Sequence, residues 1–138
     1  MVFGGVFAKN INIIQKELDV SVLRRNVIAN NIANSDTPNF KRTVVNFETQ
    51  LKRALDSEKV KPFPAVLTDK RHIPFYTPMD YRKVQPKRVL DYLTTSKNNG
   101  NNVDIEEEMM NALENQMLYQ TLVQAVSSEF TRVNLVLR

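Results

Sequence analysis

Hydrophobic residues recur at helical spacing in two long segments, one near each end of the chain. In the second, steps of four and three residues alternate to the end of the sequence, interrupted in composition only by Gln116. The series is Ile105, Met109, Ala112, Gln116, Tyr119, Val123, Val126, Phe130, Val133 and Leu137. This spacing is that of a heptad a/d seam and predicts a coiled-coil-like helix whose seam serves as an assembly interface.

Polar residues mark the start of this helix. Asp104 can cap it, and Glu107 follows three residues later, as in a capping box. Glu106, Glu107 and Glu108 also place negative charge in the first turn, where the helix dipole favours it. At 1.5 Å per residue the helix would be roughly 50 Å long.

The segment near the N-terminus, about Lys9 to Asn34, contains neither Pro nor Gly and carries two apolar stripes. One stripe comprises Ile11, Ile14, Leu18, Val22, Ala29 and Ile32, and the other comprises Ile13, Val20, Leu23 and Val27. Two stripes predict a helix that packs on more than one side, although its β-branched residues make strand a local competitor. The two terminal helices must pair with each other, with other subunits, or with both, because an apolar seam left in water is costly.

The middle of the chain differs from both ends. Five of the six prolines lie between Pro62 and Pro86, which excludes one regular helix there. The polar, glycine-containing run at residues 97–102 separates this stretch from the last helix. We therefore predict one mainly α domain in three parts: residues 1–40, a Pro-rich irregular or small β middle at 41–102, and a heptad helix at 103–138.

Composition removes several classes of function. The 138-residue chain has no Cys, which excludes disulfides, thiol nucleophiles and cysteine-ligated zinc, and its single histidine, His72, cannot form a multi-histidine metal site. No run of about 18 apolar residues predicts a membrane span, and no cleavable secretory signal is visible. We also find no paired carboxylates with helper groups and no phosphate-cradling glycine loop, so we expect no enzyme, cofactor or small-molecule substrate.

Charge is unevenly distributed along the chain. Residues 41–90 contain 12 Lys or Arg against five Asp or Glu, whereas residues 91–138 contain three against seven. A basic segment can bind nucleic acid, form a solvated face, or meet the acidic segment of another copy. Three classes of function therefore remain at this point: a structural assembly subunit, a coiled-coil adaptor, and a small basic nucleic-acid-binding protein.

The end of the first helical segment predicts a turn. Asn30, Asn31 and Asn34 cluster where a helix should end, because asparagine competes for backbone hydrogen bonds. The following Thr-Pro-Asn-Phe sequence fits a turn with Pro38 in the second position and Asn39, which tolerates positive φ, in the third.

The wording of this segment resembles the N-terminal signature of bacterial flagellar rod, hook and hook-associated axial proteins. The matching residues are Ala29, Asn30, Asn31, Ile32, Ala33, Asn34, Thr37, Pro38, Asn39 and Phe40. The family usually has Gly and Tyr at the last two positions, so a role of the tyrosine hydroxyl is in doubt here. The last helix of the short rod subunits is resembled by residues 101–106, 115–116 and 119–120. The proximal rod subunit in particular is resembled by residues 67–73.

This resemblance implies a non-enzymatic structural subunit of the proximal rod, the drive shaft that crosses the periplasm. It implies helical stacking of paired terminal helices with copies of itself and other rod subunits. It further implies partners at the rod-base adaptor, the export gate and the membrane ring, and type III export without a cleaved signal. Neither nucleic acid nor a small-molecule substrate is expected as a partner.

The extreme N-terminus has a further candidate site. Phe3, Phe7 and Ile11 are each four residues apart and resemble the short hydrophobic export-gate signal of early rod and hook subunits. The same spacing is equally expected from ordinary packing on one helix face.

Overall fold

The computed structural model describes residues 3–60, 66, 68–73, 77–94 and 98–137. Its elements, in chain order, are helix α1 (Phe3–Ala33), strand β1 (Thr43–Asn46), helix α2 (Glu48–Lys59), the 3-10 turn η1 (Tyr81–Lys83), strand β2 (Lys87–Leu90) and helix α3 (Ile105–Val136). The chain divides into two compact units, residues 1–45 with 88–138 and residues 46–87.

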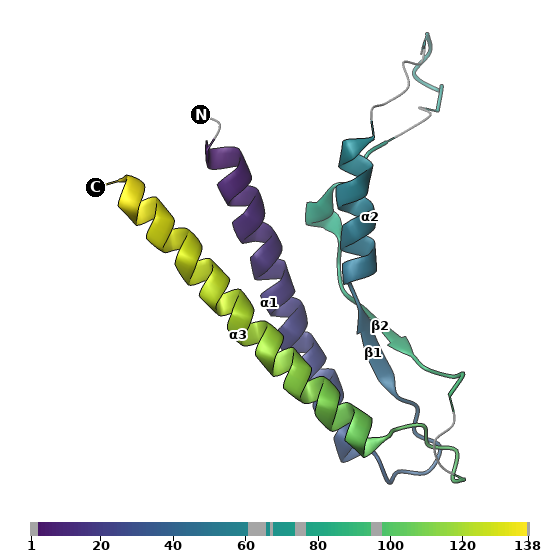
Figure 1. The fold of residues 1–138 in the computed structure, drawn as a ribbon. Helices are drawn as coiled ribbons and strands as arrows, with labels where there is room; N and C mark the ends of the chain where they lie inside the picture. Colours follow the sequence, from purple (N-terminus) through teal and green to yellow (C-terminus); the bar gives the residue numbers. More distant parts are fainter. Residues whose placement is uncertain (1–2, 61–65, 67, 74–76, 95–97, 138) are drawn as a thin grey trace. The chain divides into compact units, whose positions relative to one another are not determined.

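The first unit is built on the two terminal helices, which pair with each other (Figure 1). They lie side by side where α1 ends and α3 begins, and both chain termini lie at the other end of the pair (Figure 1). The two strands form a two-stranded sheet. The predicted fold class, mainly α with paired terminal helices and a short middle containing small strands, is therefore confirmed.

The start of α3 has the cap that its sequence predicts at Asp104, but Glu107 makes a different contact from the one predicted. Asp104 is the N-cap residue, and its side chain accepts a hydrogen bond from the Glu106 N–H at 2.9 Å. The carboxylate of Glu107, which a capping box would turn back toward the cap, instead pairs with the Arg42 guanidinium at 2.7 Å. The first turn of α3 is thus tied to the segment that follows α1.

The interior of the first unit is unusually polar. Among the described residues it buries only four hydrophobic residues, Val20, Val27, Ile28 and Val103. It buries seven polar or charged ones: Ser21, Asn31, Ser35, Asn101, Asn102, Glu108 and Asn115. Since buried polar groups must be hydrogen-bonded to be tolerated, most of the specificity of this interior comes from paired polar groups.

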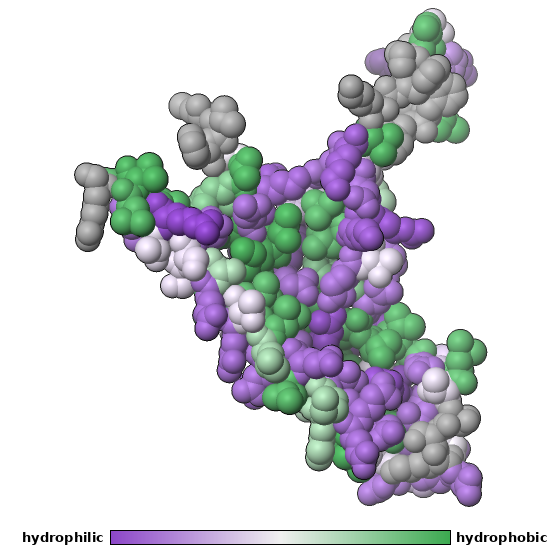
Figure 2. Space-filling model, viewed as in Figure 1, coloured by the Kyte–Doolittle hydropathy of each residue, from purple (hydrophilic) through white to green (hydrophobic). Residues whose placement is uncertain are grey.

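The exterior of α3 is correspondingly apolar. Large hydrophobic side chains are exposed along its whole length: Met109, Met110, Leu113, Met117, Leu118, Tyr119, Val123, Phe130, Leu135 and Val136. Figure 2 shows hydrophobic residues alternating with hydrophilic ones over the terminal helices, with an exposed hydrophobic group near the end of α3. No helix in the described part of the chain is long and apolar enough to cross a membrane.

The second unit has a small core of its own. Phe47, which precedes α2, is buried with Leu51 and Ala54 of α2, as are Tyr81 and Val84 at η1. The Ser57 hydroxyl accepts a hydrogen bond from the Met79 N–H at 2.9 Å and ties the end of α2 to the segment before η1. Residues 61–65 and 74–76 of the Pro-rich middle lie outside the described residues.

Candidate assembly site

The turn after α1 has the geometry that its sequence predicts. The Phe40 N–H donates to the Thr37 carbonyl at 3.3 Å, and Asn39 has a φ of 60°. A positive φ at the third position with proline at the second is the arrangement of a type II turn. Pro38 and Asn39 thus occupy the second and third positions of this turn, which redirects the chain from α1 toward β1.

Asn101 fastens this turn to the segment that precedes α3. Its side-chain amide nitrogen lies 2.9 Å from each of three carbonyl oxygens, those of Asn34, Ser35 and Thr37. Its side-chain oxygen accepts from the Val103 N–H at 2.7 Å. Carbonyls at a helix C-terminus have no partner within the helix. The buried Asn101 side chain therefore satisfies the end of α1 from a position 67 residues away along the chain.

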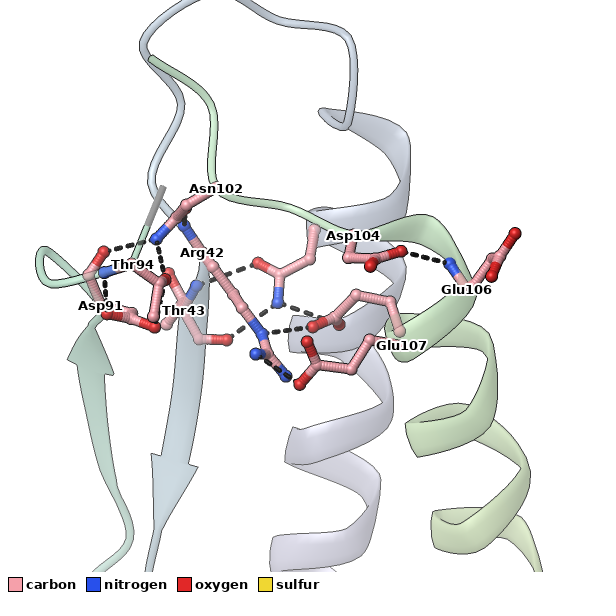
Figure 3. Close-up of polar contacts among 10 residues, drawn as sticks. Arg42, Thr43, Asp91, Thr94, Asn102, Asp104, Glu106 and Glu107 are labelled. Atoms are coloured by element: carbon pink, nitrogen blue, oxygen red, sulfur yellow. Dashed lines mark hydrogen bonds and ion pairs between the residues drawn. The ribbon is translucent and has the colours of Figure 1, made fainter. Parts of the chain in front are cut away.

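The side-chain amides of Asn102 and Asn31 each form two hydrogen bonds to backbone groups near β1 and β2. The Asn102 side chain accepts from the Arg42 N–H at 2.6 Å and donates to the Asp91 carbonyl at 2.7 Å, so it bridges the two chain segments (Figure 3). Asn31 donates to the Thr43 carbonyl at 2.9 Å and accepts from the Thr43 N–H at 3.1 Å. Both amides thus supply a donor and an acceptor together, as a neighbouring strand does.

A charged cluster completes the junction, by which we mean the contacts that join the segment after α1 (residues 34–43) to the start of α3 (residues 101–108). Arg42 Nε lies 2.6 Å from Glu108 Oε1, and Arg42 Nη1 lies 2.7 Å from Glu107 Oε1 (Figure 3). Asn31 donates to the second oxygen of Glu108 at 3.1 Å. The Glu108 side chain is only 2% exposed, so its charge depends on these partners.

The surroundings also shift the titration of two groups. Burial by itself lowers the pKa of Arg42, but attraction to Glu108 and hydrogen bonds to both glutamates outweigh it, so the pKa is raised. The Thr94 hydroxyl and the Leu93 N–H lower the pKa of Asp91 by donating to its carboxylate. Both shifts favour the charged form, that of the Arg42 guanidinium and that of the Asp91 carboxylate (Figure 3).

A second polar pair lies further along the helix pair. The Ser21 hydroxyl donates to the Asn115 side-chain oxygen at 3.0 Å, and the Asn115 amide donates to the Ser21 carbonyl at 2.9 Å. Ser21 and Asn115 are both buried. This pair fixes the lengthwise register of α1 against α3, because sliding either helix by one turn would leave buried polar groups without partners.

The asparagines at positions 30, 31 and 34 of the motif have different environments. Asn31 is buried in the charged cluster, whereas the Asn34 side chain donates to the Asn30 carbonyl at 2.8 Å on an exposed face of α1. Of the remaining motif residues, Ile32 and Phe40 are half-buried, and Ala29, Ala33, Thr37 and Pro38 are exposed. Sequence reasoning missed the pairing of Arg42 with Glu108 and of Ser21 with Asn115, and the one local signal was Ser21, a polar residue between Val20 and Val22.

The predicted assembly seam of α3 lies mostly on the outside of this unit. Its exposed members are Met109, Gln116, Tyr119, Val123, Phe130 and Leu137, and its half-buried members are Ile105, Ala112, Val126 and Val133. Near the chain ends, the Phe7 and Phe130 rings meet edge to face with centroids 6.1 Å apart. Of the other export candidates, Ile11 is half-buried, and the side chain of Phe3 lies outside the described part of the chain.

Gly100 provides a test of the junction's geometry. It has a φ of 78°, and a Cβ atom there would lie 2.7 Å from the Asn39 side-chain oxygen. We expect Gly100→Ala to lower the free energy of unfolding by about 1–2 kcal/mol, because both the backbone and the neighbouring side chain resist it. Urea denaturation followed by circular dichroism measures the change.

Gly5 is the matched control for this substitution. A Cβ atom at Gly5 meets nothing within 4 Å, and the residue lies in α1. Gly5→Ala should be neutral or stabilising by less than about 1 kcal/mol, since alanine is the better helix former. Equal destabilisation by the two substitutions would contradict the strained junction.

A polar interior joined to apolar outer helix faces is typical of a structural subunit that other protein surfaces cover. A profile of the flagella basal body rod protein family matches residues 23–41, which span the motif and the turn. The chain is 41% identical to the flagellar basal body rod protein FlgB of Borrelia hermsii, over 96% of this chain and 98% of that protein.

Other relatives carry the same name. Identity to the FlgB of Borreliella burgdorferi is 38% over 96% of this chain and 98% of that protein. Identity to the FlgB of Bacillus subtilis is 35% over 96% of this chain and 95% of that protein. The chain therefore belongs to the family of flagellar basal body rod proteins, as its motif predicts, and it is a structural subunit rather than a general coiled-coil adaptor.

Proposed function

We propose that this chain stacks into the proximal part of the rod through its paired terminal helices, contacting copies of itself and other rod subunits. The observation that carries the proposal is the inversion of polarity in the first unit, which buries mainly polar residues and exposes the apolar residues of α3. Exposed apolar patches of this extent mark interaction surfaces, because leaving them in water costs free energy.

The predicted seam residues are the proposed contact surface. Met109, Tyr119, Val123 and Phe130 are between 41% and 59% exposed, so much of each side chain is available to a neighbouring subunit. A head-to-tail contact that does not close into a ring generates a helix, which is the geometry that a rod needs. The basic segment 41–90 and the acidic residues of α3 would set the register between subunits.

The cellular location of the chain and the route of its export follow from the same proposal. The rod lies in the basal body and crosses the periplasm, and its lowest subunits would meet the rod-base adaptor, the export gate and the membrane ring. Export would use the flagellar type III apparatus without cleavage of a signal. Phe3, Phe7 and Ile11 remain a candidate export signal, and the contact of Phe7 with Phe130 supports a packing role for Phe7 as well.

Electron microscopy of isolated basal bodies tests the proposal directly. Rods from cells that produce the chain should contain density for α1 and α3 paired as in the first unit, with the outer face of α3 covered by neighbouring subunits. Basal bodies with complete rods from cells lacking the chain would overturn the proposal.

A second prediction concerns the dilute, unassembled chain. Beyond Val20 toward the N-terminus and beyond Asn115 toward the C-terminus, no described side chain of α1 or α3 is buried. Helix segments without packing are marginal in water. We therefore expect circular dichroism of the dilute chain to show less helix than the 31 residues of α1 and 32 of α3 require, and assembly to restore it.

The concentration dependence of the signal distinguishes the alternatives. Helix content should rise as the chain is concentrated or mixed with isolated rods, because neighbours then cover the exposed faces. A dilute chain that is fully helical and melts cooperatively would contradict the prediction.

A further inference from the structure

The first unit contains a groove of about 420 Å³ between α1, β1 and α3. Val27 and Ile28 of α1 are buried beneath it, Val44 and Val45 of β1 form one side, and Leu118 of α3 lies on the other. A cavity of this size is in the range that binds a ligand or a few residues of peptide. These five apolar residues, out of twelve that line the groove, offer a surface for apolar side chains of an incoming segment.

The rim of the groove carries an available negative charge. Glu114 of α3 lines it and is exposed, and within the described part of the chain its carboxylate forms no ion pair or hydrogen bond. Two arginines line the same groove, and neither is without a partner: Arg42 is held by Glu107 and Glu108, and Arg24 has an interaction of its own. An occupant that places a lysine or arginine beside apolar residues would therefore match the groove in charge as well as in polarity.

The backbone of β1 offers a free edge inside the groove. The Arg42 carbonyl accepts from the Asp91 N–H on the side of β2, whereas the Thr43 N–H and carbonyl bond to Asn31 on the opposite side. Backbone groups alternate in direction along a strand, so those of Val45 point to the same side as those of Thr43. Outside the β1–β2 ladder, no hydrogen bond among the described residues uses the Val45 backbone.

The same chain carries a segment with the matching chemistry. Strand β2, Lys87–Leu90, has the sequence Lys-Arg-Val-Leu and is exposed at all four positions. Among the residues that the structure describes, it is paired on one side only, with β1. An exposed edge strand with apolar side chains is a template for pairing with another chain. Val89 and Leu90 are 46% and 45% exposed, and Lys87 and Arg88 supply the cations.

We propose that the groove receives strand β2 of a second copy of this chain. The incoming strand lies beside Val45, its Leu90 rests on Val27 and Ile28, and its Arg88, on the same face of the strand as Leu90, pairs with Glu114. The donor and acceptor surfaces differ, so the contact is head to tail and can continue from copy to copy. This inference deepens the proposed rod function and rests on it.

The absence of cysteine from the chain makes a clean crosslinking test possible. Cells would produce two single-cysteine variants together, Leu118→Cys in the groove and Leu90→Cys on β2, and isolated basal bodies would be oxidised. Because each chain carries one cysteine, a disulfide between the two variants joins two copies. The control pairs Leu118→Cys with Ile73→Cys, since Ile73 is 87% exposed but lies outside β2.

We expect about tenfold more disulfide-linked heterodimer from the Leu118 and Leu90 pair than from the control, because docking raises the local thiol concentration. Adding Glu114→Lys to the Leu118→Cys chain should reduce the yield to the control level, and adding Arg88→Glu to the Leu90→Cys chain as well should restore it. Basal bodies that contain the variants but give only the control yield would overturn the groove contact and leave the rod function standing. Basal bodies that lack the unmodified chain would overturn the rod function itself.

Discussion

Arg42→Ala is expected to lower the free energy of unfolding of the first unit by about 3 kcal/mol. The substitution leaves the Glu108 carboxylate, whose side chain is 2% exposed, with the Asn31 amide but without its cation. Removing one member of a buried ion pair typically costs 3–5 kcal/mol, because the remaining charge is neither hydrated nor neutralised. Urea denaturation followed by circular dichroism measures the loss, and hydrogen exchange at residues 101–108 locates it.

Arg132→Ala is the matched control on the same helix pair. Arg132 forms an ion pair with Glu129 at 3.4 Å, but its side chain is 74% exposed. Exposed ion pairs contribute little, so we expect a loss below about 0.5 kcal/mol. If both arginine variants lose the same small amount of stability, the charged cluster does not hold the junction. A double variant, Arg42→Leu with Glu108→Leu, should be more stable than Arg42→Ala because no unpaired charge stays buried.

Val123→Asp is expected to abolish incorporation of the chain into rods while leaving its synthesis and its folded monomer intact. Val123 is 45% exposed on the outside of α3, so an aspartate there remains hydrated in the monomer and changes its stability by less than about 0.5 kcal/mol. In an assembled seam the same carboxylate would be buried without a partner, at a cost of several kcal/mol. Motility assays and immunoblots of isolated basal bodies measure the result.

Gln124→Asp is the control for charge alone, since Gln124 is exposed and next to Val123 but is not a seam residue. It should leave motility and rods normal. Phe130→Asp should also block incorporation, although it removes the contact with Phe7 and therefore alters the monomer as well. Normal motility and normal rods in the Val123→Asp strain would exclude this face of α3 from assembly.

The local features of this fold were predictable because short-range chemistry decides them. The turn at residues 37–40 follows from the fixed φ of proline and the tolerance of Asn39 for a φ of 60°. The start of α3 follows from Asp104, whose carboxylate caps the first turn. The start of α1 at Phe3 was not predicted, because Gly4 and Gly5 argue against helix there.

The interface between α1 and α3 was harder to derive from the sequence. An apolar heptad pattern indicates that a helix packs against a partner, but it does not identify that partner. In the structure the α3 residues most deeply buried in the unit are Glu108 and Asn115, which lie outside the apolar seam. Their partners, Arg42, Asn31 and Ser21, are 66 to 94 residues away along the chain. No local pattern links residues at such separations.

The sequence by itself determined the two long helices, the turn between α1 and β1, and membership of the rod family through the motif at residues 29–40. These features depend on the hydrophobic period, the backbone preferences of single residues and a short sequence motif, and each of them can be recognised within one continuous stretch of sequence. Only the tertiary structure decided which face of α3 turns toward α1 and which stays open. That choice depends on whether buried amides and carboxylates find partners, and Asn101, Asn102 and Arg42 find theirs only when distant segments meet.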